Sequence, residues 1–129
     1  MDGPVVLLVE DEALVLMVAQ EALEAGGYSV LIAEDGTDAM EILDGQADKL
    51  AGLVTDVRLG SGPDGWEIAR HARELRSDLP IVYMTGDSAG DWSVHGVPNS
   101  VVVQKPYAPA QLVTAFSTLM TAVDTNRAS

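Results

Sequence analysis

The feature that most constrains the fold is the regular alternation of short apolar runs with longer amphipathic segments. Five such runs occur, at residues 4–9, 28–33, 50–55, 80–84 and 100–104. Continuous apolar runs of this length are typical of strands that are buried on both faces of a parallel sheet. Each run is followed by a segment with helical features, so the pattern predicts a doubly wound α/β domain with helices on both sides of the sheet.

Local signals set the helix boundaries. The predicted helices cover residues 12–25, residues 37–46, a segment that starts at Asp64-Gly65 and stops before Pro80, and a final segment after residue 107. Thr37 is expected to cap the second helix. Residues 86–96 contain three glycines, which predicts a short or labile helix there. The pattern predicts one domain over residues 1–123, followed by a short, frayed polar tail at 124–129.

Composition excludes several classes of function. The formal net charge of −13 argues against binding to nucleic acid, which requires a basic surface. The chain has no cysteine, so disulfides and thiolate-bound metals are excluded. No apolar stretch is long enough to cross a bilayer and no signal peptide is recognisable, which predicts a cytoplasmic protein without membrane contact. Two interpretations stay open, a stand-alone protein and a domain cut from a larger one, and Met1 and the polar tail favour the first.

Polar side chains follow four of the five predicted strands. They are Glu10, Asp11 and Glu12 after the first strand, Asp56 at the end of the third, Thr85 after the fourth and Lys105 after the fifth. Singly, each is explained by a helix cap, a turn or the surface. Together they indicate a site, because the carboxyl ends of parallel strands lie on one edge of the sheet. Crowded carboxylates need a neutralising cation, and oxygen ligands suit Mg²⁺.

Four ordered motifs then carry a family resemblance. They are Val9-Glu10-Asp11-Glu12, Asp56, Met84-Thr85-Gly86 and Lys105-Pro106-Tyr107. This set resembles the marker motifs of response-regulator receiver domains over nearly the whole chain, to about residue 123. The resemblance implies a flavodoxin-like (βα)5 sandwich with strand order 2-1-3-4-5. It also implies a phosphoacceptor in two-component signalling that catalyses only its own phosphorylation and dephosphorylation.

The resemblance assigns a role to each motif. Asp56 would attack a phosphohistidine of a sensor histidine kinase or a histidine phosphotransfer protein, giving an aspartyl phosphate. The implied ligands of Mg²⁺ are the Glu10, Asp11 and Asp56 carboxylates and the backbone carbonyl of Arg58. Thr85 and Lys105 would hold the phosphoryl oxygens, and a cis peptide between Lys105 and Pro106 would turn the lysine into the pocket. Signalling would proceed through contacts with a downstream protein.

Three features depart from the family pattern. Many receivers carry Tyr or Phe three residues before the lysine, whereas this chain has Val102. The loop from Asp56 to Asp64 is one residue longer than the usual form. The glycine-rich segment 86–96 is hypothesised to be mobile and to order on phosphorylation, in place of an aromatic switch.

The first predicted helix offers a partner surface. Its expected buried stripe comprises Val15, Val18, Ala19, Ala22 and Leu23. Leu16 and Met17 lie off this stripe. They either widen it or, if exposed, dock a kinase or phosphotransfer helix or a second copy of the chain. The expected state is a monomer or a weak homodimer.

Two alternative functions involve the same residues. A haloacid-dehalogenase-type enzyme is disfavoured, because its nucleophile ends the first strand in an Asp-x-Asp motif and no cap domain is present. A degenerate receiver that binds partners without being phosphorylated is the stronger alternative. Retention of every phosphorylation residue argues against this adaptor, and Val102 keeps the alternative open.

Overall fold

The fold is built on a five-stranded parallel sheet. The computed structural model describes the backbone of residues 3–128 and the side chains of residues 3–123. The strands are β1 (Val5–Val9), β2 (Ser29–Ala33), β3 (Gly52–Asp56), β4 (Ile81–Thr85) and β5 (Val101–Gln104). All neighbouring pairs are parallel, in the order β2-β1-β3-β4-β5. The flavodoxin-like order implied by the resemblance is therefore confirmed.

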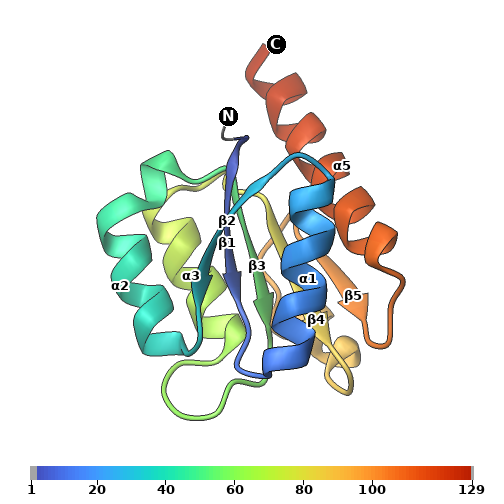
Figure 1. Cartoon of the computed structure of the whole chain (residues 1–129). Coiled ribbons are helices and arrows are strands. Elements are labelled where there is room, and N and C mark those ends of the chain that lie inside the picture. Colours follow the sequence, from blue (N-terminus) through green and yellow to red (C-terminus); the bar gives the residue numbers. More distant parts are fainter. Residues whose placement is uncertain (1–2, 129) are drawn as a thin grey trace.

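Helices cover both faces of this sheet. They are α1 (Ala13–Ala25), α2 (Gly36–Gln46), α3 (Gly65–Leu75), α4 (Trp92–His95) and α5 (Pro109–Ala128), with 3₁₀ turns η1 (Ala47–Lys49) and η2 (Ala89–Asp91). In Figure 1, α1 and α5 lie on one side of the sheet and α2 and α3 on the other. None of the helices within the described part of the chain combines the length and apolar character that a membrane span requires.

Alternation along each strand divides the core into two layers. Leu7 and Val9 of β1 pack in the layer under α2 and α3, whereas Val6 and Leu8 pack in the layer under α1 and α5. All four side chains are fully buried. The continuous apolar runs arise because each strand must supply both layers.

Two helix boundaries differ from prediction. Asp35, not Thr37, caps α2, because the helix begins at Gly36 and the Asp35 carboxylate accepts a hydrogen bond from the Asp38 N–H at 2.8 Å. The last helix also ends later than predicted, since α5 continues past residue 123 to Ala128.

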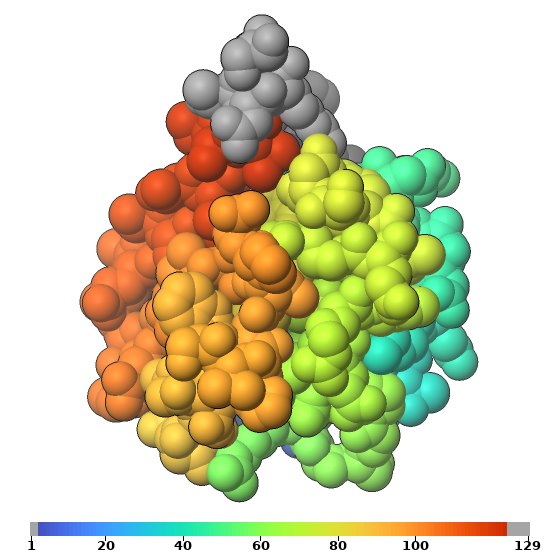
Figure 2. Space-filling view, turned by 180° about the vertical axis from the view of Figure 1, so that it is seen from behind, coloured from blue at the N-terminus to red at the C-terminus, as the bar shows by residue number. Residues whose placement is uncertain are grey.

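The glycine-rich segment forms only short helical pieces, as predicted. The turn η2 leads into α4, which has four residues. Figure 2 shows this segment, in yellow to orange, between α3 in yellow-green and α5 in red-orange.

The buried stripe of α1 is rotated from its predicted position. Ala19, Ala22 and Leu23 are buried, but Val18 is 47% exposed. Leu16 instead packs against the layer under α1 and α5, while Leu14 and Met17 are exposed. The rotation follows from the contact between α1 and α5, which draws Leu16 inward. An apolar surface at Leu14, Met17 and Val18 is left uncovered in the described chain.

Candidate functional site

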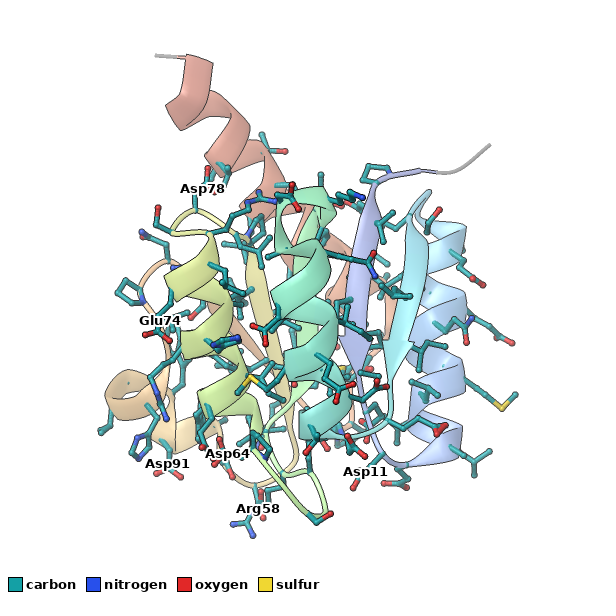
Figure 3. All side chains as sticks on the ribbon, turned by 90° about the vertical axis from the view of Figure 1, so that its left-hand side faces the viewer. Asp11, Arg58, Asp64, Glu74, Asp78 and Asp91 are labelled. Atoms are coloured by element: carbon teal, nitrogen blue, oxygen red, sulfur yellow. The ribbon has the colours of Figure 1, made fainter. Side chains whose placement is uncertain are left out.

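Three carboxylates meet at the carboxyl edge of the sheet. Glu10 and Asp11 follow β1, Asp56 ends β3, and these two strands are neighbours. One ligand oxygen from each carboxylate lies within 4.8 Å of the others. Glu10 and Asp56 are buried, whereas Asp11 is exposed. Figure 3 shows Asp11 on the same edge as Arg58. The predicted convergence of acids is therefore present in the structure.

Lys105 reaches this cluster from the end of β5. Its Nζ lies 3.0 Å from Oε1 of Glu10 and 3.4 Å from Oδ1 of Asp56. The peptide bond between Lys105 and Pro106 is cis, as expected. Burial acts to lower the pKa of Lys105, but the hydrogen bond to Glu10 and the charges of Asp56 and Glu10 outweigh it, so the pKa is raised. The ammonium is thus held in its charged form.

One lysine does not neutralise the acids around it. Burial, followed by the charge of Glu10, raises the pKa of Asp56 from 3.8 to about 6, although Lys105 and the Val57 N–H act in the opposite direction. An ionised Asp56 therefore sits in unfavourable surroundings. A further cation would relieve this repulsion.

Each acid is oriented by at least one backbone N–H. The Glu12 N–H donates to Glu10 at 3.1 Å, the Val57 N–H to Oδ1 of Asp56 at 3.0 Å, and the Gly60 N–H to Oδ2 of Asp11 at 2.9 Å. Within the described part of the chain, Oδ2 of Asp56 makes no hydrogen bond. This oxygen is therefore the one left free to react.

Thr85 connects the site to the segment that follows β4. Its side chain is buried, and Oγ1 accepts hydrogen bonds from the Ser88 N–H at 2.8 Å and the Asp87 N–H at 3.3 Å. The hydroxyl hydrogen is left for an acceptor in the pocket. A group that accepted a hydrogen bond from the Thr85 hydroxyl would disturb the hydrogen bonds of Oγ1 to Asp87 and Ser88, and so the turn before η2.

The donor set suits Mg²⁺. It consists only of carboxylate oxygens, it is partly buried, and it carries more negative charge than Lys105 balances. Mg²⁺ prefers oxygen ligands, including one or two carboxylates with waters and phosphate oxygens. This acidic pocket is therefore able to bind the ion.

Comparison with known proteins identifies the family. The sequence pattern of the response regulator receiver domain matches residues 6–117, which is most of the chain. The chain belongs to the response-regulator receiver family. The module is thus a phosphoacceptor of two-component signalling.

Individual relatives agree with this assignment. Response regulator MprA of Mycobacterium avium is 30% identical over 117 residues, covering 89% of this chain and 50% of MprA. The chain spans about half the length of the curated relatives that it matches. A response regulator receiver protein from Sinorhizobium medicae is 40% identical with a TM-score of 0.90, covering 94% of this chain and 97% of that one.

A receiver domain from a kinase is also similar. The receiver domain of the sensor histidine kinase PA1611 from Pseudomonas aeruginosa has a magnesium ion coordinated in its active-site cleft. It is 26% identical to this chain with a TM-score of 0.79, over 92% of this chain and 98% of that one.

The side chain of Arg58 points away from the acids of this receiver. Its Nε lies 3.1 Å from Oδ1 of Asp87 and 3.4 Å from Oγ of Ser88, and its side chain is largely exposed. Sequence reasoning assigned the backbone carbonyl of Arg58 to the site and named Arg58 and Asp87 as positions that could tune the lifetime of the phosphoryl group. The link to Ser88 was missed, although a serine three residues after Thr85 is a recognisable turn signal.

Tyr83 fills the interior next to Val102. The two residues are neighbours in the β4–β5 register, and both belong to the layer under α2 and α3. The Tyr83 hydroxyl accepts a hydrogen bond from the Val97 N–H at 3.0 Å, and its ring lies 4.6 Å from the Trp66 ring. Beside Val102, the buried aromatic ring therefore comes from β4, and its hydroxyl is hydrogen-bonded to Val97, which follows α4.

Proposed function

We propose that this receiver is a single-domain response regulator that accepts a phosphoryl group on Asp56 in a Mg²⁺-dependent reaction. The donor is a phosphohistidine of a sensor histidine kinase or a histidine phosphotransfer protein. The observation that carries the proposal is the position of Asp56, which lies close to a second buried acid, Glu10, and shares the ammonium of Lys105 with it. That arrangement provides a nucleophile, a place for a cation and a fixed positive charge.

The reaction follows from the positions of these groups. Oδ2 of Asp56 forms a bond to phosphorus while the bond from phosphorus to the histidine nitrogen breaks, and that nitrogen keeps the electron pair. At neutral pH a carboxyl with a pKa of about 6 is mostly ionised and able to attack. Lys105 balances charge on the phosphoryl oxygens, and the Thr85 hydroxyl donates a hydrogen bond to one of them.

Metal binding would complete the charge balance. The Glu10, Asp11 and Asp56 carboxylates and the backbone carbonyl of Arg58 would hold Mg²⁺. The bound ion supplies charge neutralisation to the transferring group. The magnesium ion in the PA1611 receiver domain supports this assignment.

The uncovered apolar surface of α1 would receive the phosphodonor. Leu14, Val15 and Val18 face Lys105, Pro106 and Tyr107 across a groove of about 420 Å³. This groove leads directly to the lysine of the site, so a helix docked there would bring its histidine to Asp56. We expect Leu14→Glu to reduce transfer from a phosphohistidine protein while phosphorylation by acetyl phosphate stays unchanged. Equal loss with both donors would contradict docking on α1.

The proposal also covers the extent, location and partners of the receiver. The proposal includes a receiver unit over residues 1–123 with a polar tail at 124–129, a cytoplasmic location, and a monomer or weak homodimer that signals to a protein target. With a net charge of −13, a nucleic-acid partner is not expected. Phosphorylation is expected to draw Thr85 from Ser88, and amide exchange across 86–96 would report that change.

Intact-mass measurement tests the proposal. The full chain is incubated with acetyl phosphate and Mg²⁺, beside an EDTA control and an Asp56→Asn control. The expected result is a phosphoryl adduct in the first sample alone. No adduct with acetyl phosphate or with a phosphohistidine protein would overturn the proposal and favour the phosphorylation-independent adaptor.

A further inference from the structure

Asp11 differs from the other two acids in how it is held. Glu10 and Asp56 are buried and contact Lys105, whereas Asp11 is exposed. Among the described residues, the only hydrogen-bond partner of the Asp11 side chain is the N–H of Gly60, at 2.9 Å from Oδ2. The conformation of this carboxylate therefore depends on one backbone donor from the loop between β3 and α3.

That loop is anchored at two places. At its end, the Gly65 N–H donates to the Val57 carbonyl at 2.9 Å. On its outer side, Pro63 lies so close to Gly36 that a Cβ on Gly36 would overlap the Pro63 carbonyl. The loop between Asp56 and Asp64 thus spans from the acid cluster to the first residue of α2, and Gly60 lies over Asp11.

We propose that the Gly60 N–H is a positioning donor for the Mg²⁺ site. By holding one oxygen of Asp11, it leaves the other oxygen directed to the cluster formed with Glu10 and Asp56. This inference rests on the proposed function, since it assumes that the three acids bind Mg²⁺. It assigns a role to the loop between β3 and α3, which brings the Gly60 N–H to Asp11.

The physical basis is the cost of ordering an exposed side chain. A free aspartate at the surface samples several rotamers and loses that freedom when it binds a metal. A hydrogen bond to the second carboxylate oxygen reduces this loss before the ion arrives. Outer-shell donors of this kind typically change metal affinity by about 10–100-fold. Because Asp11 is exposed, we expect the lower end of that range.

The position offers its own matched pair of variants. Gly60→Pro removes the N–H donor, whereas Gly60→Ala keeps it. A Cβ at residue 60 would meet Oδ2 of Asp11 at 3.5 Å, an ordinary van der Waals contact. We expect Gly60→Pro to weaken Mg²⁺ binding about tenfold, and Gly60→Ala to retain most of the affinity.

A third variant tests the anchor from a distance. Gly36→Ala would force Pro63 away from α2, moving the loop without touching residue 60 or the acids. It is expected to weaken Mg²⁺ binding in the same direction as Gly60→Pro. If Gly60→Pro does not fold, Gly36→Ala tests the positioning role of the loop in its place.

The experiment is calorimetric titration of the full chain of 129 residues with Mg²⁺, without any phosphodonor. Thermal unfolding in EDTA shows that each variant is folded. Tight binding to wild type together with unchanged binding to the folded Gly60→Pro variant, or to Gly36→Ala if that variant alone folds, would overturn the positioning role alone. Equal losses in Gly60→Pro and Gly60→Ala would also overturn it, because the N–H would then not be the cause. Failure of wild type to bind Mg²⁺ would instead remove the metal from the proposed function and this inference with it.

Discussion

The two edges of the sheet use charged side chains in opposite ways. At the carboxyl edge, Glu10 and Asp56 are buried together, and Lys105 is the one cation among the described residues that forms an ion pair with them. At the amino edge, Arg73 donates to the carbonyls of Leu79, Pro98 and Asn99. Figure 3 shows this separation, with Asp11 and Arg58 at one edge and Asp78 at the other.

This difference assigns a stabilising role to the amino edge and a chemical role to the carboxyl edge. At the amino edge, the cations of Arg73 and Arg76 face carbonyls at the ends of loops, and Arg76 donates to the carbonyls of Ala47 and Leu50. These contacts join the segments that lead into β3, β4 and β5. At the carboxyl edge the charges are left unbalanced, which costs stability and creates a site for a cation and a phosphoryl group.

The largest effect is expected from Lys105→Met at the carboxyl edge. Without the ammonium, the fully buried side chain of Glu10 and the carboxylate of Asp56 both lose the cation that lies beside them. Breaking a buried ion pair on one side costs about 3 kcal/mol of the free energy of unfolding. Urea denaturation at pH 7.5 in EDTA measures this loss. Wild-type stability in Lys105→Met would mean that Lys105 does not balance the acids.

The next effect is expected from Arg73→Ala at the amino edge. The change removes three hydrogen bonds to backbone carbonyls, and we expect a loss of about 2 kcal/mol. No carboxylate of the site is involved, so the loss is expected to be the same with and without Mg²⁺. Urea denaturation in both conditions checks this, and a Mg²⁺-dependent loss would show that the two edges are coupled.

Asp56→Asn is expected to stabilise the metal-free protein. The folded-state pKa of Asp56 is raised to about 6, so its ionised form disfavours folding. At about 1.4 kcal/mol per pKa unit, the rise from 3.8 to about 6 means that neutralisation gains at most about 3 kcal/mol at neutral pH. The penalty is absent below about pH 4, develops between about pH 4 and 6, and is complete above that range. Calorimetric melting in EDTA is expected to show a gain that disappears near pH 4; a constant gain would contradict the cause.

The smallest effect is expected from Arg58→Ala. Its ion pair with Asp87 lies at the carboxyl edge but joins two largely exposed side chains. Such pairs contribute about 0.5 kcal/mol or less to the free energy of unfolding, and salt weakens this contribution by screening the charges. Urea denaturation at low and high salt tests this. A loss comparable to that of Arg73→Ala would show that Arg58 has a structural role that its exposure does not indicate.

Sequence predicted the parts of the molecule that depend on local patterns. The apolar runs gave all five strands, and strand ends gave the cluster of Glu10, Asp11, Asp56 and Lys105, because parallel strands align their carboxyl ends. The strand order came from family resemblance. Alternation and strand direction are properties of the chain itself, which is why they are readable before folding.

Features that depend on packing between elements were not predictable. The face that α1 buries is set by its contact with α5, so Val18 was misplaced. The contact of Gly60 with Asp11 joins residues 49 positions apart and depends on the path of a loop. Tyr83 showed no signal in its own strand, because its role arises from its neighbour Val102 and from Val97.

The most direct test of the central claim locates the phosphoryl group. The full chain is treated with acetyl phosphate and Mg²⁺, then with borohydride, which reduces an aspartyl phosphate to homoserine with release of phosphate. Peptide mass spectrometry then identifies the modified residue. We expect homoserine at position 56, and none when Mg²⁺ is removed. Modification at another residue, or an unmodified Asp56, would contradict the assignment of the phosphoacceptor.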